Sequence, residues 1–419
     1  MKNKILYILV VVFSISFLNI NAENRENTSD TLTMSPSYAN DIYYSMSSGE
    51  VENIPRAGWD IAFYTAAFSA GIIINEGSGV VLYTYPNGDT ASWGHVDTTG
   101  MSTWNNLINS AEIWEDGAFN RNSTGHPNYG WGVYNSVTHD VVGDSIYVIN
   151  TPDAGLKKIW IVRKVSVENT YFVKYANIDG TDEQTVELDI KPFADKNFIY
   201  FSLNTNELID REPSDDWDIL FTKYYDVTYD IEGNPSDYLV TGATSNVNRD
   251  ANKFYPVADN FMDWSSKSFE TLKNVIGYNW KSFDMETFSW AIEDSTAFFV
   301  KDEAGDVYKL VFTYWQGSST GKFAFDKEIV SLSSIDNNID KQDYMTVYPN
   351  PTSDLINISL LNKSSEANLV IYDMSGRIVH NSLINNSTIS LNSNEFNSGL
   401  YFITIIGDDY RETKKLVVQ

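Results

Sequence analysis

The sequence contains no cysteine and only four histidines among its 419 residues. The absence of cysteine excludes disulfides, thiolate metal sites, cysteine catalysis and a lipidated N-terminal cysteine. Catalytic motifs of fixed spacing are also missing, including the Gly-x-Ser-x-Gly elbow, a phosphate-cradling glycine loop and the HExxH zinc signature. Pairs of acidic residues do occur, but a chain with 56 carboxylates offers many by surface solvation alone. We therefore predict that the protein is not an enzyme.

Basic residues are scarce, with 29 lysines and arginines against 56 acidic residues and a net charge of −27. Nucleic acids and anionic membrane surfaces attract proteins through basic patches. Their absence predicts no nucleic-acid partner. Acidity on this scale is typical of a well-solvated extracellular surface.

Long hydrophobic runs are absent except at the N-terminus. Lys2 and Lys4 precede an apolar stretch at residues 5–18, and Ala22 supplies a small residue before a cleavage site. A membrane-spanning helix needs about 20 apolar residues, so this shorter run indicates a signal peptide at residues 1–22. We expect the mature chain to start near Glu23, with no transmembrane segment.

Two stretches of the chain repeat one another. Residues 59–63 (WDIAF) return as residues 217–221 (WDILF), and the aromatic run at 41–46 (DIYYSM) returns at 198–203 (FIYFSL). The offset between the copies is 158 residues at the tryptophan and 157 at the run, and so nearly constant a period indicates duplication. The pentapeptide alternates large apolar residues with Asp and Ala or Leu, which predicts a strand with one buried face. Its aspartate is free to hold a neighbouring backbone N–H or an arginine.

Further strand-like segments follow each copy in the same order. They indicate antiparallel meanders at 145–149, 158–162 and 170–175 and at 295–300, 309–312 and 322–325. A helical spacing of apolar residues predicts one short helix per copy. The spaced residues are Trp104, Leu107, Ile108, Ala111 and Trp114 in the first copy and Phe269, Leu272, Ile276 and Trp280 in the second.

These landmarks resemble the HmuY family of haem-binding proteins over about residues 36–332. The resemblance rests on the WDIAF strand, an aromatic-Val/Ile strand, a glycine-containing turn, a Lys-Ile-x-Ile strand and a final aromatic strand. It implies an all-β fold of two repeated antiparallel β-domains, each with a short helix, at residues 34–191 and 192–334. It also implies capture of haem by two axial side chains, His or Met.

Any haem site is expected in the first copy, because the second contains no histidine. His95 and His126 lie in loops rich in Gly, Asn and Ser, where β-scaffolds commonly display ligands. His139 is a third candidate, and Met101 offers a thioether as an axial ligand. Polar loop histidines without a metal are the alternative. No other metal site is predicted.

The C-terminal part has a different composition. After a polar linker at 335–345, residues 346–419 carry only five basic and seven acidic side chains in short, evenly spaced strands, which predicts a small β-sandwich. Four ordered motifs stand at 348–351 (YPNP), 371–377 (IYDMSGR), 398–401 (SGLY) and 414–418 (KKLVV). They resemble the type A C-terminal sorting domain of type IX secretion. The resemblance implies export through both membranes to the cell surface or medium, with the secretion machinery as a partner.

The sequence therefore predicts an exported, HmuY-like binding protein. Two interpretations stay open beside capture of haem. The doubled β-scaffold serves either as a surface protein that binds host proteins or glycans through exposed aromatics, or as a structural component of the surface.

Overall fold

A computed structural model describes residues 28–213, 217–230, 232–331 and 345–418, the last range with gaps at 353, 361–366, 374–376, 385–387 and 407–410. The predicted signal peptide at 1–22 and most of the predicted linker at 335–345 lie outside the described residues. Two compact units divide the chain at Ser334 and Ile335. The predicted all-β class is confirmed, since strands and short 3-10 turns make up the regular structure of the described residues. No helix among them is long and apolar enough to cross a membrane.

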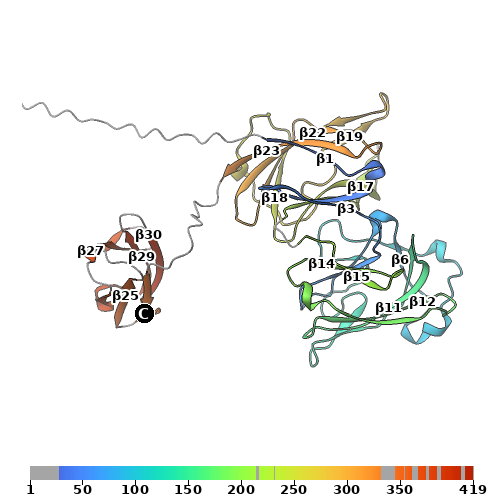
Figure 1. Cartoon of the computed structure of the whole chain (residues 1–419), viewed down its shortest axis with the longest axis horizontal. Helices are drawn as coiled ribbons and strands as arrows, with labels where there is room; N and C mark the ends of the chain where they lie inside the picture. Colours follow the sequence, from blue (N-terminus) through green and yellow to red (C-terminus); the bar gives the residue numbers. More distant parts are fainter. Residues whose placement is uncertain are drawn as a thin grey trace, which may run out of the picture. The chain divides into compact units, whose positions relative to one another are not determined.

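The first unit contains two β-sandwiches, which we call lobe 1 (residues 57–213) and lobe 2 (residues 28–56 and 217–331); Figure 1 shows both. Each lobe buries one large hydrophobic core that draws residues from both of its sheets.

Lobe 1 pairs a four-stranded sheet with an eight-stranded one. The smaller sheet has the order β15 (Glu207–Ile209), β14 (Phe198–Ser202), β4 (Ile61–Tyr64) and β5 (Ile72–Ile74). The larger sheet has the order β13 (Gln184–Asp189), β12 (Thr170–Asn177), β11 (Gly155–Val165), β10 (Tyr147–Thr151), β6 (Val81–Thr84) and β7 (Asn106–Leu107), with β9 (Val141–Gly143) on β11 and β8 (Gly132–Tyr134) on β9.

Lobe 2 pairs a four-stranded sheet with a five-stranded one and adds a separate hairpin. The smaller sheet has the order β17 (Pro235–Ser245), β16 (Ile219–Tyr229), β2 (Asn40–Ser45) and β3 (Gly49–Pro55). The larger has the order β1 (Thr28–Thr33), β23 (Lys322–Ser331), β22 (Val307–Trp315), β21 (Ala297–Lys301) and β18 (Asp250–Phe254). The hairpin consists of β19 (Lys281–Asp284) and β20 (Ser289–Ile292).

The repeated segments exchange partners between the lobes. Strand β2, which holds the first aromatic run, pairs with β16, the second WD-aromatic strand. Strand β14, which holds the second run, pairs with β4, the first WD-aromatic strand. Strand β1 completes the exchange by pairing with β23, and Figure 1 shows the blue β1 beside the orange β23. Lobe 2 is thus closed by the N-terminal segment, and its sheets combine strands from both sides of the predicted repeat boundary at 191 and 192.

The two WD-aromatic strands are buried on both faces, whereas alternation predicted one. Ile61 and Phe63 enter the core of lobe 1, while Trp59 and Ala62 pack with Phe198 and Tyr200 in a second cluster. That second cluster faces the contact between the lobes, which the local pattern of the strand does not encode.

The predicted short helices are wrong. Residues 104–114 form strand β7 and irregular backbone, and residues 269–280 form turns with isolated β-bridges at Glu270 and Gly277, with no α-helix in either stretch. The physical reason is visible at Asn109, whose side chain accepts from the N–H of Ile74 and Ala118 and donates to the Ile74 carbonyl. These bonds tie Asn109 to the backbone of β5, 35 residues away in sequence, a contact that the local spacing of apolar residues does not encode.

Eight 3-10 turns are described along the chain. They are η1 (Pro36–Tyr38), η2 (Glu76–Ser78), η3 (Thr90–His95), η4 (Met101–Thr103), η5 (Ala118–Asn120), η6 (Lys191–Phe193), η7 (Trp264–Ser266) and η8 (Ser393–Glu395). Of these, η1 carries one wall of the groove described below.

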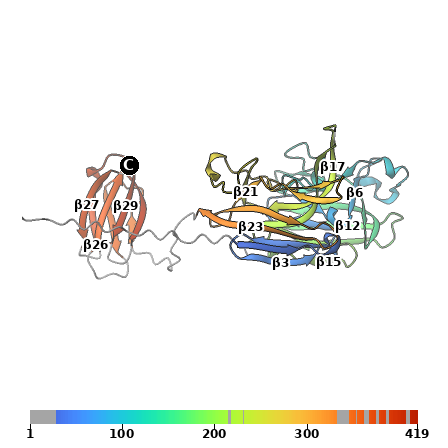
Figure 2. The ribbon, with the colours of Figure 1, turned by 90° about the horizontal axis from the view of Figure 1, so that it is seen from above.

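The second unit is a small sandwich with its own core, as the sequence predicts (Figure 2). One sheet has the order β24 (Met345–Tyr348), β25 (Leu355–Leu360) and β28 (Thr388–Asn392). The other has the order β27 (Ile378–Ile384), β26 (Ala367–Asp373), β29 (Gly399–Ile406) and β30 (Arg411–Val418).

Candidate functional site

The two lobes meet through a pair of equivalent tyrosines. The hydroxyls of Tyr43 in lobe 2 and Tyr200 in lobe 1 lie 3.2 Å apart in a hydrogen bond. Each ring packs edge-on against the tryptophan of its own lobe, Tyr43 on Trp217 and Tyr200 on Trp59. The repeated sequence segments therefore contribute their tyrosines and tryptophans to the lobe contact.

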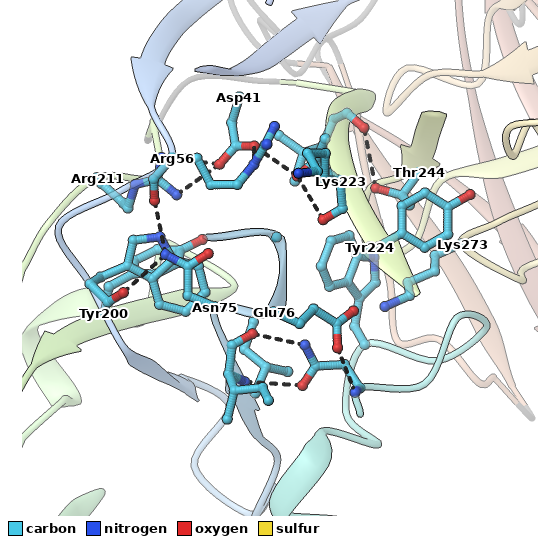
Figure 3. Close-up of a pocket in the computed structure, with 18 of the residues that line it drawn as sticks. Asp41, Arg56, Asn75, Glu76, Tyr200, Arg211, Lys223, Tyr224, Thr244 and Lys273 are labelled. Carbon is cyan, nitrogen blue, oxygen red and sulfur yellow. Dashed lines mark hydrogen bonds and ion pairs between the residues drawn. The ribbon is translucent and has the colours of Figure 1, made fainter. Parts of the chain in front are cut away.

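A buried ionic cluster lies beside these tyrosines (Figure 3). The Asp41 carboxylate accepts from Arg56 Nε at 2.7 Å and from Arg211 at 3.2 Å, and all three side chains are buried. Burial alone would raise the pKa of Asp41, but the two guanidinium groups hold it below its usual value. Because Arg211 belongs to lobe 1 and Asp41 to lobe 2, this cluster joins the lobes.

Glu76 makes a second polar bridge between the lobes. Its carboxylate accepts from the N–H of Asn109 in lobe 1 at 2.9 Å and from the N–H of Tyr225 in lobe 2 at 3.0 Å. Burial raises the pKa of Glu76 to about 7, although both N–H groups oppose the rise. Figure 3 shows Lys273 facing it, and burial lowers the pKa of that lysine to about 8.

The cavity between these groups has a volume of about 70 Å³. Pockets for small-molecule ligands usually measure about 300–1,000 Å³, so this cavity is small for such a ligand. We conclude that the inter-lobe cluster is chiefly structural: it fixes the two lobes as one body.

A larger hollow lies on lobe 2, between the β16–β17 hairpin and the β19–β20 hairpin. This hollow, the aromatic groove, has a volume of about 500 Å³. Six of its twelve lining residues are aromatic, three are serine or threonine, and none is acidic. The lining residues are Tyr38, Thr228, Tyr238, Leu239, Val240, Thr241, Tyr278, Lys281, Ser282, Phe283, Trp290 and Trp315.

The aromatic rings of the groove are held at defined angles. Tyr38 stacks on Trp315 with ring centroids 5.3 Å apart, and Trp290 lies edge-on to both Trp315 and Phe283. Gly317, whose φ is +81°, makes room for Trp290, because a Cβ there would lie 2.5 Å from the indole nitrogen. Tyr238, Phe283 and Trp290 stay 64, 42 and 37% exposed, so they are available to a ligand.

Lys281 forms the floor of the groove. Its ammonium donates to the carbonyls of Thr241 at 2.6 Å and Tyr278 at 3.2 Å and lies over the rings of Trp280 and Trp315. Burial lowers the pKa of Lys281 to about 7. These contacts hold the walls of the groove together beneath the exposed rings.

The predicted haem ligands do not converge as a set. His95 ends η3 and is exposed, while Met101 is half-buried against Tyr85 and Val148 as a packing residue. His126 and His139 do meet, at Tyr134: the His126 ring lies 5.1 Å from it, and His139 Nδ1 is hydrogen-bonded to its hydroxyl.

The surroundings of these imidazoles do not fit an enclosed haem. Both are exposed, and the neighbouring Val137 is 85% exposed, so the residues supply ligand atoms without apolar walls. None of the four predicted ligands lines the inter-lobe cavity or the groove. Within the described ranges, no cluster of three or more His, Asp or Glu side chains is placed to hold a metal ion.

Sequence reasoning missed the groove, although the chain carries a signal for it. Tyr278, Trp280, Phe283, Phe288 and Trp290 crowd into thirteen residues around a turn. The predicted helix ended at Trp280, and the aromatics that follow it entered no prediction. The hairpin instead leaves Phe283, Phe288 and Trp290 exposed.

Three of the four C-terminal motifs make structural contacts in the small sandwich. Asn350 donates to the Lys415 carbonyl at 2.7 Å and accepts from Val417 N at 2.9 Å, so the YPNP segment is bonded to the last strand. The Tyr401 hydroxyl donates to the Asn397 carbonyl at 2.8 Å and closes the turn before β29. The motifs thus bring both ends of the unit together.

Comparison with curated proteins gives one limited match. A 97-residue segment is 35% identical to an ulvan lyase, NLR42, of Nonlabens ulvanivorans, covering 22% of this chain and 18% of the lyase. The chain therefore spans less than a fifth of that relative, whose activity does not carry over. The prediction that this protein is not an enzyme is neither confirmed nor contradicted by it.

Two solved structures show slight likeness. PorZ, a surface component of the type IX secretion system of Porphyromonas gingivalis, is 10% identical with a TM-score of 0.18, covering 68% of this chain and 44% of PorZ. Dimeric latent PorU of the same organism is 11% identical with a TM-score of 0.15, covering 93% of this chain and 34% of PorU. TM-scores this low support no transfer of fold or function.

The family comparison matches the C-terminal unit alone. Residues 346–419 match the model described as "Secretion system C-terminal sorting domain". The match does not reach residues 36–332, so the resemblance to the haem-binding family there stays a prediction. Residues 346–419 are a type IX secretion C-terminal sorting domain, which marks the chain for the type IX machinery and for export to the cell surface or the extracellular space.

Proposed function

We propose that the two-lobed body is an exported glycan-binding protein, with the aromatic groove of lobe 2 as its binding site. The proposal joins two observations. The sorting domain directs the chain to the cell exterior, where polysaccharides are available. The groove combines aromatic faces with hydroxyl groups in a hollow large enough for sugar rings.

The composition of the groove is the observation that carries the proposal. Ligand sites are typically apolar and aromatic hollows with a few placed polar groups. A sugar ring presents an apolar C–H face and a rim of hydroxyls, which matches aromatic planes beside Thr228, Thr241 and Ser282. In a chain with 56 acidic residues, a groove lined by none is distinct from the rest of the surface.

The shape of the groove also favours a chain-like ligand. The groove is open rather than enclosed, and it continues into a second hollow through shared residues. Trp290 and Tyr238 stand on different hairpins, β19–β20 and β16–β17, so a linear saccharide in the groove contacts both.

A glycan array probed with the exported protein tests the proposal. We expect binding to at least one polysaccharide class, weakened about tenfold by Trp290→Ala, a loss of about 1.4 kcal/mol. Tyr255→Ala is the matched control, because Tyr255 is an exposed lobe 2 aromatic that does not line the groove. Absence of binding to every glycan, or equal losses in both variants, rejects the proposal.

A further inference from the structure

The aromatic groove leads into a second hollow, the basic end, with a volume of about 570 Å³. The two hollows share Tyr38, Tyr238, Leu239 and Thr241, so a ligand in the groove extends directly into the basic end. The remaining residues that line the basic end are Ser37, Lys223, Tyr225, Asp237 and Ser318.

Strand pairing places Lys223 next to the floor of the groove. Lys223 on β16 is directly opposite Thr241 on β17. Directly opposed residues of an antiparallel pair point to the same face, with Cβ atoms about 5 Å apart. Thr241 in turn supplies the carbonyl that holds Lys281. Lys223 therefore stands one strand away from the groove.

The charges around Lys223 do not balance. Asp41 is the carboxylate of the neighbouring ionic cluster, and both Arg56 and Arg211 already pair with it. Arg56 also donates to the carbonyls of Tyr38 and Asn40, so all three of its side-chain nitrogens are hydrogen-bonded.

Lys223 adds a third cation to this cluster. Its ammonium has no hydrogen bond or ion pair within the part of lobes 1 and 2 that the structure describes. Burial lowers the pKa of Lys223, and the charge of Arg56 lowers it further. Asp237 is the one acidic residue lining the basic end. An anionic group placed here meets an unpaired lysine backed by a guanidinium.

We infer that the basic end recognises an anionic substituent, a carboxylate or a sulfate ester, on the glycan bound in the aromatic groove. The inference rests on the proposed glycan-binding function and specifies its ligand as an acidic sugar. The aromatic rings supply contacts common to neutral and acidic glycans, whereas Lys223 interacts only with the charged substituent. Charge preference and ring stacking are therefore separable by mutation.

Two matched pairs of probes test the inference and distinguish the two sources of charge. Oligogalacturonate is compared with its carboxyl-reduced form, and a sulfated galactan with its desulfated form. We expect the wild-type protein to bind at least one anionic form ten times or more tightly than its neutral counterpart. Lys223→Gln should abolish that preference and leave the neutral affinity unchanged, while Trp290→Ala should weaken both forms.

Lys253→Gln is the matched control, because Lys253 is a half-buried lobe 2 lysine bonded to Asn279 and outside both hollows. Equal affinity for charged and neutral probes, or a preference that survives Lys223→Gln, overturns the inference. Either result leaves glycan binding itself intact if Trp290→Ala still weakens binding. Loss of the Trp290 effect on the array rejects the proposed function instead.

Discussion

At the scale of single residues, the two aspartates of the repeat act in the same way. Asp60 accepts from Leu203 N and Asp218 from Met46 N, each at 2.7 Å, and each bond ties down the turn that follows the exchanged aromatic strand. Asp218 also accepts from Arg249 Nε at 2.8 Å. The expected role of this aspartate, holding a backbone N–H or an arginine, is confirmed in both forms.

We predict unequal costs for removing these aspartates. Asp60→Ala should destabilise the protein by about 1–3 kcal/mol, the cost of a buried unsatisfied donor. Asp218→Ala should cost about 3–5 kcal/mol, because it also breaks a buried ion pair. Unfolding in urea, followed by tryptophan fluorescence, reports the body alone, since all 11 tryptophans precede residue 346. Equal losses would show that the Arg249 pair is unimportant.

Lys281 predicts a dependence of stability on pH. A buried lysine with a pKa of about 7 is less protonated than in the unfolded chain between pH 7 and about 10.5, so wild-type stability rises across this window. Lys281→Met removes this dependence. We expect the variant to gain stability relative to wild type at pH 6 and to lose most of that advantage by pH 9.

Denaturation curves at pH 6 and pH 9 measure this effect. Lys164→Met in lobe 1 is measured for comparison, because burial also lowers the pKa of Lys164 to about 7. A Lys281→Met stability difference that stays constant between the two pH values contradicts the assignment.

Haem binding stays a prediction, and His126 and His139 are the two candidate ligands that lie together, both against Tyr134. Titration of haem into the exported protein tests it. A saturable Soret band lost in His126→Ala or His139→Ala and kept in His95→Ala supports this pair. A flat titration, or a band unaffected by all three substitutions, rejects haem capture by these histidines.

At the scale of elements, the N-terminal segment, residues 28–56, completes both sheets of lobe 2. β1, β2 and β3 supply edge or central strands to both of its sheets, and Leu32, Ile42 and Tyr44 enter its core. Their counterparts in lobe 1 are β13, β14 and β15, which follow the other strands of that lobe in sequence. Moving residues 28–56 behind residue 331 therefore reproduces the order of lobe 1.

We predict that such a circular permutant folds. Residues 57–331 joined by a short linker to 28–56 keep every strand pair, because β1 runs antiparallel to β23 and starts opposite Lys327 near its end. Near-ultraviolet circular dichroism should match that of the unpermuted body. Deletion of residues 28–56 should expose the core of lobe 2 and bind a hydrophobic dye. A deletion variant with native circular dichroism contradicts the strand exchange.

At the scale of the whole molecule, the two units divide export from binding. Removal of residues 346–419 should retain the body in the periplasm, because the sorting domain is what marks the chain for type IX export. Fractionation and immunoblotting of cells that express the truncated protein measure this. The body should keep its glycan binding, since its cores are separate from the core of the sorting domain. Normal secretion of the truncated protein contradicts the assignment.

The sequence alone was sufficient for the all-β class and the sorting domain. Strand alternation and turn residues are local, so the meander over β10, β11 and β12 and the strands of the C-terminal unit were predictable. The helix prediction failed because it, too, used only the local pattern of the sequence. A helical spacing of apolar residues was present, but Asn109 binds its side chain to the backbone of β5, a contact far away in sequence.

Only the tertiary structure decided which copies pair and where ligands bind. The two aromatic runs have the same pattern, so each fits either WD-aromatic strand equally well by local rules, and long-range packing selects the exchanged partner. The groove arises from that choice: η1 and Tyr38 reach Trp315 because the N-terminal segment closes lobe 2. The histidines were predicted as haem ligands from their residue type, whereas a binding site depends on which side chains the fold brings together.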